Sequence, residues 1–201
     1  MPDSQYFDSV PTAESHPVSF ETVFGGRHFR FLTDSGVFSK GELDKGTHLL
    51  LSALPEGLSG RALDLGCGWG AVGVIAGSLY PGLRFTMSDV NTRAVELAKQ
   101  NAAANGVHAR VLCRDGLAGL DEKFDLILLN PPIRAGKETV YRLFRECAEH
   151  LDEKGRLYIV IRKQQGADSA MKYLKTLFTA VETADRSAGY RVFVCQGGCH
   201  V

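Results

Sequence analysis

The chain has 201 residues, 44% of them hydrophobic, and its 23 basic residues are balanced by 23 acidic ones. A chain of this length can bury the core of one domain, and it has no apolar run of the roughly 18 residues that a membrane span needs. With five cysteines and no apolar leader-like start, we expect a soluble, cytoplasmic protein. The neutral net charge excludes a strongly basic nucleic-acid binder, so any RNA contact must come from a local patch.

The N-terminal part is expected to hold an arm, a hairpin and a helix. Residues 1–17 contain three acids, three prolines and no Lys or Arg, which predicts a flexible arm ahead of a single domain over residues 18–201. From Phe20 to Phe31, two apolar runs flank Gly25-Gly26 and predict a β-hairpin. Leucines at helical spacing from Leu43 to Leu54 predict a helix that faces the core.

Beyond Gly60, short apolar runs alternate with helical periodicity, which is typical of an α/β fold with a parallel sheet. Asn91 is expected to cap a helix that ends at Gly106, and further helices are expected over Val140 to Leu151 and Ala167 to Leu177. The last two strands are joined by only about seven residues, so we expect them to pair antiparallel. The predicted strands are Arg61 to Leu65, Leu83 to Ser88, Ala109 to Cys113, Phe124 to Leu129, Leu157 to Ile161, Phe178 to Glu182 and Tyr190 to Cys195.

A glycine-rich loop, Asp64-Leu65-Gly66-Cys67-Gly68-Trp69-Gly70, follows the first of these strands and leads into a helix. Glycines there let the backbone approach a ligand closely, although a tight strand-to-helix turn is the open alternative. The second strand ends at Asp89, where a carboxylate can accept hydrogen bonds from both ribose hydroxyls of a nucleoside. Asp64 would repel a pyrophosphate and attract a cation, such as the sulfonium and ammonium groups of S-adenosylmethionine.

This loop, paired with an acidic end of the second strand, resembles the cofactor signature of class I methyltransferases. The resemblance implies a Rossmann-like fold with a seven-stranded, mostly parallel sheet, an antiparallel last strand, and an added N-terminal hairpin and helix. It implies S-adenosylmethionine as the cofactor. For Asp115, an ordinary Asp-Gly turn remains open. The resemblance assigns the methionine part of the cofactor to Asp64, Gly66, Gly68 and Gly70, the ribose to Asp89 and the adenine to Asp115.

A second motif, Asn130-Pro131-Pro132-Ile133, follows the buried strand Phe124 to Leu129. The two prolines restrict the backbone and remove two hydrogen-bond donors. At the carboxyl edge of a parallel sheet, the Asn130 side-chain oxygen and the Pro131 carbonyl could both accept from one amino group of a substrate. Such a site would act by positioning and electrostatics, without a metal or a covalent nucleophile. Taken alone, the motif could also be a loop cap.

The Asn-Pro-Pro motif resembles that of enzymes that methylate adenine N6, guanine N2, cytosine N4 or a glutamine amide, which assigns Asn130, Pro131, Pro132 and Ile133 to catalysis. Its fourth position is commonly aromatic in those enzymes, so Ile133 leaves the acceptor open. Together with Phe38-Ser39 and Thr47 ahead of the glycine loop, it resembles the single-domain form of the rRNA small-subunit guanine-N2 methyltransferase C (RsmC-like) family. That resemblance places Thr47 near the methionine end of the cofactor and Phe38 against the substrate; helix entry and core packing are the alternative.

The same resemblance implies ribosomal RNA, or the small ribosomal subunit, as the partner. Arg134 and Lys137 follow the motif directly and are predicted to contact phosphate. Arg142 and Arg145 lie among acids and are interpreted as a solvated helix face.

Several alternatives stay open on the sequence alone. They are a glutamine-amide or adenine-N6 methyltransferase, a non-catalytic module that binds S-adenosylmethionine and, more distantly, a nicotinamide-dependent oxidoreductase. No metal is expected, because Cys195, Cys199 and His200 have no second cluster of ligands at suitable spacing. The oligomeric state is not defined by any pattern in the sequence.

Overall fold

The computed structural model describes residues 14–37, 41–117 and 119–198. Its first elements are β1 (Val18–Phe24) and β2 (Arg27–Thr33), which pair antiparallel from end to end. Gly25 and Gly26 both have positive φ, 57° and 74°, as the favoured two-residue hairpin turn requires. The predicted hairpin is therefore confirmed. Of the predicted arm, residues 1–13 lie outside the described part, and Ser15 Oγ donates a hydrogen bond to Asp34.

A seven-stranded sheet forms the centre of the molecule, with strand order β5-β4-β3-β6-β7-β9-β8. All its pairings are parallel except the two that β9 makes with β7 and β8. This confirms the expected fold class and the antiparallel last strand. The elements after the hairpin are α1 (Lys45–Ser52), β3 (Ser59–Leu65), α2 (Ala71–Leu79), β4 (Gly82–Asp89), α3 (Thr92–Ala104), β5 (Ala109–Cys113), β6 (Phe124–Leu129), the 3-10 helix η1 (Ile133–Ala135), α4 (Lys137–His150), β7 (Leu151–Arg162), the 3-10 helix η2 (Lys163–Gln165), α5 (Ala167–Leu177), β8 (Phe178–Ser187) and β9 (Tyr190–Gly198).

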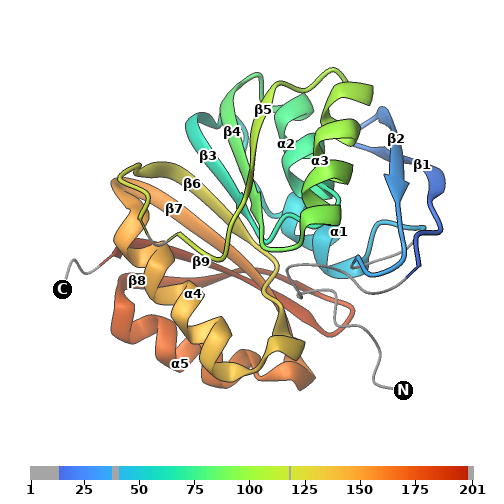
Figure 1. Cartoon of the computed structure of the whole chain (residues 1–201). Coiled ribbons are helices and arrows are strands. Elements are labelled where there is room, and N and C mark those ends of the chain that lie inside the picture. Colours follow the sequence, from blue (N-terminus) through green and yellow to red (C-terminus); the bar gives the residue numbers. More distant parts are fainter. Residues whose placement is uncertain (1–13, 38–40, 118, 199–201) are drawn as a thin grey trace.

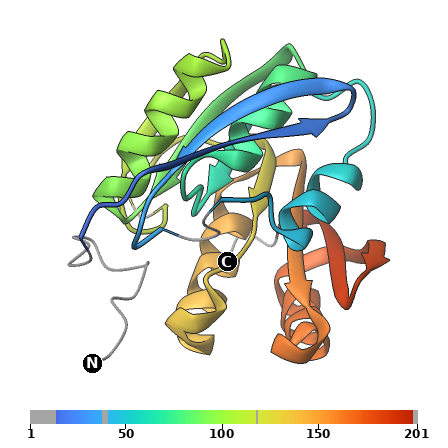
Figure 2. The same ribbon diagram turned by 90° about the vertical axis from the view of Figure 1, so that its right-hand side faces the viewer.

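Helices cover both faces of this sheet. α1, α2 and α3 lie on one face, α4 and α5 lie on the other, and the hairpin packs outside the first layer against α3 (Figures 1 and 2). Two buried clusters follow from this arrangement, as β6 illustrates: Leu126 and Leu128 belong to the cluster under α1 to α3, whereas Ile127 and Leu129 belong to the cluster under α4 and α5. A strand buried on both faces needs such a continuous apolar run.

The helix signals are confirmed closely. Asn91 caps α3 by accepting hydrogen bonds from the backbone of Arg93 and Ala94, and Gly106 follows the helix with a φ of 66°. α5 has the predicted bounds.

The strand bounds on the α5 side of the sheet differ from the prediction. β7 begins at Leu151, directly after α4, instead of at Leu157. Its polar first half looks like a turn in sequence, but Leu151 pairs with Phe124 and the register shifts before the next pair. Gly155 permits that irregularity, because a side-chain carbon there would stand 2.7 Å from the Phe124 carbonyl oxygen. Because β6 pairs parallel with β3, with Leu129 opposite Leu65, it ends at the same sheet edge as β3, β4 and β5.

Candidate active site

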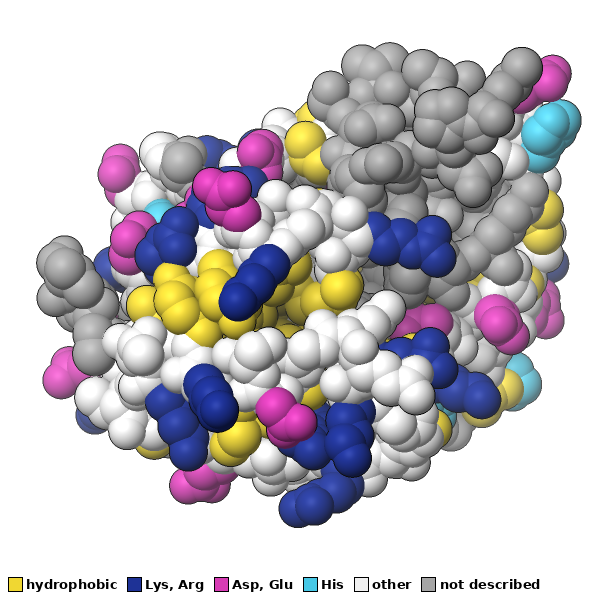
Figure 3. All heavy atoms as spheres, turned by 90° about the horizontal axis from the view of Figure 1, so that it is seen from below, with side chains coloured by type: hydrophobic (Ala, Val, Ile, Leu, Met, Phe, Trp, Pro, Cys, Tyr) yellow, Lys and Arg dark blue, Asp and Glu magenta, His cyan; other side chains and the backbone are white. Residues whose placement is uncertain are grey.

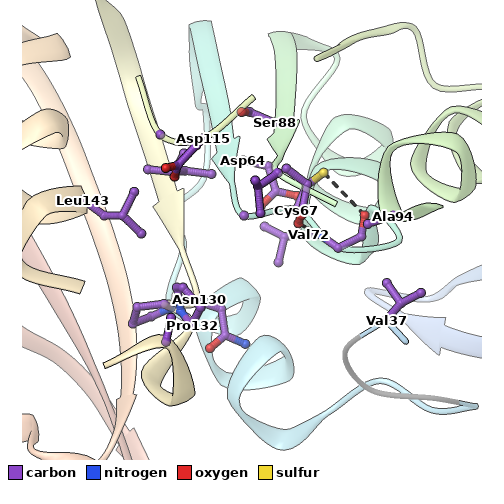
Figure 4. A pocket seen from close by; sticks show the side chains of 18 of the residues that line it. Val37, Asp64, Cys67, Val72, Ser88, Ala94, Asp115, Asn130, Pro132 and Leu143 are labelled. Carbon is purple, nitrogen blue, oxygen red and sulfur yellow. Dashed lines mark hydrogen bonds between the residues drawn. The ribbon is translucent and has the colours of Figure 1, made fainter. Parts of the chain in front are cut away.

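A cavity of about 350 Å³ lies where β3, β4, β5 and β6 end. This is the edge of an open parallel sheet at which ligands bind, and the volume is in the range of small-molecule sites. Figure 4 shows Asp64 and Cys67 on one side of the cavity and Asn130 and Pro132 on the other. The two motifs of the sequence therefore face one another across a single space.

The glycine loop turns over the end of β4 and presents its backbone to the cavity. The amides of Gly66 and Cys67 both donate to the Ser88 carbonyl, at 2.8 and 3.0 Å. Gly66 and Gly68 have positive φ, and no heavy atom lies within 4 Å of where a side-chain carbon would stand at either position. Open space therefore lies next to exposed backbone, as a closely held ligand requires.

Asp64 lies at the bottom of the loop and is only 3% exposed. One of its oxygens accepts a hydrogen bond from the backbone N–H of Gly73 at 2.8 Å. A side chain at Gly73 would collide with Met87, 2.5 Å from its sulfur, so glycine is needed for this contact. Burial raises the pKa of Asp64 to about 7, with a further contribution from the negative charge of Asp89.

Asp89 uses both of its oxygens to hold the loops around it. It accepts from Gly68 N at 2.8 Å and from Asn91 N at 2.9 Å, and burial raises its pKa above the ordinary value. Within the described ranges, no Lys or Arg forms an ion pair with Asp64 or Asp89. A buried and a half-buried carboxylate without a cation attract a ligand that carries positive charge.

Asp115 lies at the opening of the cavity, where its side chain is 66% exposed and pairs with Arg142 at 2.6 Å. Arg142 also binds Glu146 at 2.7 Å, and Glu146 accepts from the backbone N–H of Leu117. The interpretation of Arg142 as part of a solvated helix face is therefore wrong, because this side chain lines the cavity and joins α4 to the loop after β5. Arg145 is exposed and donates to the hydroxyl of Tyr173.

Asn130, Pro131 and Pro132 line the opposite wall. The Pro131 carbonyl accepts from Ile133 N at 2.8 Å across Pro132, whose φ of −74° and ψ of 76° are those of an inverse γ-turn. One lone pair of that carbonyl remains for a ligand. The Asn130 amide group donates to Thr47 Oγ1 at 3.3 Å, so its oxygen is not used by this contact.

The cavity brings together most, but not all, of the residues that the sequence singled out. Two of the three loop glycines, Gly66 and Gly68, line it. So do the side chains of Thr47, Asp64, Asp89, Asp115 and Asn130. Gly70 instead begins α2 and packs against Ala98.

Besides Gly70, three predicted residues lie away from the cavity wall, and one more lies outside the described residues. Ile133 packs against the buried cluster under α4, because the inverse γ-turn directs it there. Arg134 and Lys137 are exposed on η1 and on the first turn of α4. Phe38 lies outside the described residues.

Sequence reasoning missed several wall residues. Trp69 lines the cavity, and its ring also packs edge-on against Phe20 and Phe31. Ser88 gave no signal, although its buried hydroxyl lines the cavity and has no partner among the described residues. Further wall residues that the sequence did not single out come from other segments and include Val37, Ala94, Thr139 and Leu143.

The chain matches a model of the methyltransferase small domain over residues 28–194. That span includes both motifs and nearly the whole sheet. The chain belongs to the methyltransferase small domain family. Its enzyme class is accordingly that of the family, the S-adenosylmethionine-dependent methyltransferases.

Relatives of this family member differ in length. An uncharacterized Bacillus subtilis protein, YbxB, is 40% identical over 93% of this chain and 95% of its own length. The ribosomal RNA small subunit methyltransferase C of Pseudoalteromonas atlantica is 36% identical over 84% of this chain and 49% of its own length. A solved Thermus thermophilus 16S rRNA N2 guanine methyltransferase (RsmC), in complex with AdoMet and guanosine, matches with a TM-score of 0.83 and 27% identity, over 93% of this chain and 52% of that one. The chain thus spans about half the length of the methyltransferase C relatives.

The cavity of this family member fits S-adenosylmethionine on its own chemistry. The open space beside Gly66 and Gly68 accommodates a ligand held by backbone. The carboxylates of Asp64 and Asp89, which form no ion pair with another described residue, suit a cationic ligand, and the Ser88 hydroxyl, without a hydrogen-bond partner in the described part of the chain, gives a polar ligand one more contact.

Two expectations concern what the chain lacks. Among the described residues, no group of three or more His, Cys, Asp or Glu is placed to hold a metal ion; Cys199 and His200 lie outside these residues, so the expectation of no metal stays a prediction. In the part of the chain that the structure describes, no helix is long and apolar enough to cross a membrane.

Proposed function

We propose that this methyltransferase transfers a methyl group to an exocyclic amino group of a nucleobase, namely guanine N2 in small-subunit ribosomal RNA, and so acts in the cytoplasm. The observation that carries the proposal is the Asn130 amide, which faces Asp64 and Asp89 across one cavity while its oxygen is left over by the contact to Thr47. The Thermus thermophilus relative, a 16S rRNA N2 guanine methyltransferase solved with guanosine, supports the choice of base.

Asn130 and Pro131 hold the acceptor nitrogen in this proposal. The lone pair of an aromatic amino group is delocalised into the ring, so the nitrogen is a poor nucleophile. Two hydrogen bonds, to the Asn130 oxygen and the Pro131 carbonyl, pull its protons out of the ring plane and localise the lone pair. Such preorganised acceptors stabilise the charge that develops during transfer.

S-adenosylmethionine supplies an electrophilic methyl group. When bound, it would give up that methyl group to the acceptor nitrogen held by Asn130 and Pro131, with the electron pair of the carbon–sulfur bond left on sulfur and the surplus proton of the nitrogen released to solvent. Asp64 and Asp89 hold the cationic and ribose parts of the cofactor, and Asp115, fixed by Arg142, holds the adenine amino group. None of these residues needs to move a proton.

Arg134 and Lys137 are proposed to contact RNA phosphates. Both are exposed, and neither forms an ion pair with another described residue. They lie on η1 and α4, directly after the proposed catalytic motif. On the face seen from below in Figure 1, Lys and Arg side chains lie on both sides of a hollow lined by hydrophobic groups (Figure 3). Reaching a base there requires an unpaired or flipped nucleotide.

The test is transfer of tritiated methyl groups from S-adenosylmethionine to small ribosomal subunits from cells that lack the protein. We expect label in ribosomal RNA at one guanine. Label in a protein would instead support the glutamine-amide alternative, and label at adenine N6 of the RNA would support the adenine-N6 alternative. Cofactor binding without any transfer to RNA or protein fractions would support a non-catalytic module.

A further inference from the structure

We propose that Thr47 is a positioning residue for Asn130, which fixes the side-chain amide with its oxygen toward the acceptor nitrogen. This inference rests on the proposed function, because it concerns how the acceptor is held. Thr47 Oγ1 is the only hydrogen-bond partner of the Asn130 amide among the described residues. The two residues lie 83 positions apart in the chain, so only the fold brings them together.

The hydroxyl of Thr47 is held in place by three features of α1. The residue is 4% exposed. Its backbone N–H and that of Gly46 both donate to the capping carboxylate of Asp44, at 3.1 and 2.9 Å. The preceding residue, Gly46, packs so closely on Tyr190 of β9 that a side-chain carbon at position 46 would stand 3.0 Å from the Tyr190 ring. The first turn of α1 is thus fixed both by its own cap and by the sheet.

The direction of the amide decides whether Asn130 can hold an amino group. An amide has an oxygen that accepts and a nitrogen that donates, on opposite sides. An acceptor NH2 group needs the oxygen, and a nitrogen turned toward it would repel its protons. With the nitrogen bound to Thr47, the oxygen is presented to the cavity. Without that bond the amide can turn about its last side-chain torsion, and the preorganisation is lost.

This role differs from contact with the cofactor, which the motif ahead of the glycine loop suggested for Thr47. A residue that touches the cofactor affects cofactor affinity. A residue that orients Asn130 affects the rate at saturating cofactor and leaves that affinity unchanged. The two roles therefore separate in steady-state kinetics.

The experiment compares Thr47→Val with Thr47→Ser in the full chain. Val keeps the branched shape and removes the hydroxyl, whereas Ser keeps the hydroxyl. For Thr47→Val we expect kcat to fall about tenfold to a hundredfold, in line with small errors in the position of a reacting group, with the cofactor Kd changed less than about twofold. Thr47→Ser should restore most of the rate. Thermal unfolding of both variants checks that the fold is retained.

A second measurement does not depend on the RNA substrate. In the protein labelled with nitrogen-15, the side-chain NH2 signals of Asn130, assigned by their loss in Asn130→Asp, should shift in Thr47→Val and stay near their wild-type positions in Thr47→Ser. A rise in cofactor Kd that equals the fall in rate would overturn the inference, as would unmoved NH2 signals in Thr47→Val. If wild-type protein methylates no RNA, the proposed function fails while the NH2 signals still decide the contact.

Discussion

The two walls of the cavity are built in different ways. The cofactor wall, after β3 and β4, is made of backbone turns and of two carboxylates whose partners are near in sequence, such as Gly73 for Asp64 and Asn91 for Asp89. The acceptor wall, after β6, depends on one amide whose partner lies on α1. Substitutions in the cofactor wall should therefore change mainly the affinity for the cofactor, and substitutions in the acceptor wall mainly the rate of methyl transfer.

The largest effect is expected at Asn130. Asn130→Ala removes the acceptor of one proposed hydrogen bond to the substrate, and loss of such a preorganised contact lowers kcat by about a hundredfold to a thousandfold. The cofactor Kd, measured by calorimetry, should stay within about threefold of wild type. Parallel loss of cofactor binding and turnover would mean that the walls are not separate.

Asp89→Ala should act in the opposite way. The proposed bonds to the ribose involve a charged acceptor, so their loss raises the cofactor Kd by roughly tenfold to a hundredfold. The kcat at saturating cofactor should change much less. Because Asp89 also holds Gly68 and Asn91, Asp89→Asn serves as the milder control, and thermal unfolding shows whether the loop itself has collapsed. A large fall in kcat with unchanged Kd would contradict the assignment.

The pH dependence of cofactor binding should report Asp64. Its pKa of about 7 in the free protein means that much of it is protonated at and below neutral pH. A cationic ligand favours the ionised form, so binding releases a proton and affinity falls as pH drops below about 7, by at most about tenfold per pH unit.

Asp64→Asn should remove this slope. Calorimetric titration in buffers of different ionisation enthalpy measures the released proton directly. The raised pKa of Asp64 affects folding of the free protein in the opposite direction. The folded state holds the proton more tightly than the unfolded state, so the free energy of unfolding decreases as pH rises from about 4 to about 7. Affinity that is flat across this range in wild type would rule out Asp64 as the group that meets the cation.

The smallest effect is expected at Arg142. Arg142→Met removes the ion pair that joins Asp115 to α4, and we expect the cofactor Kd to rise about threefold to tenfold, since the ion pair is partly exposed. Arg145→Met is the matched control, because Arg145 lies on the same helix and its one side-chain hydrogen bond among the described residues is to the Tyr173 hydroxyl. Equal effects of the two substitutions would show that Arg142 does not act through Asp115.

The same division explains what the sequence could predict. The fold class, the hairpin, the cap of α3 and the glycine loop are set by local chemistry, namely apolar periodicity, backbone freedom at glycine and side-chain capping. The strand that ends at Asp89 is also predictable, because its apolar run is a local signal. By contrast, the early start of β7 was missed, because its polar first half pairs with Phe124 only through an irregular register.

Contacts between distant segments were not readable from one sequence. The partnership of Thr47 with Asn130 and that of Arg142 with Asp115 exist only after the sheet has formed. The same applies to Ile133, which follows the turn at Pro132 and packs, half-buried, against the cluster under α4. The walls of the cavity are predictable to the extent that they are local, which is why the cofactor site was clearer than the acceptor site.

The place of β9 in the sheet has a consequence for biosynthesis. β8 is synthesised before β9, and among the described residues β9 is the only strand with which it pairs. On the ribosome, β8 must therefore wait with an open edge until residues 190–198 have emerged and inserted beside β7. Tyr190, which packs against α1, arrives in the same step. The nascent chain is then expected to resist proteases over its β3 to β6 region first, and to become fully resistant only after β9 has left the exit tunnel.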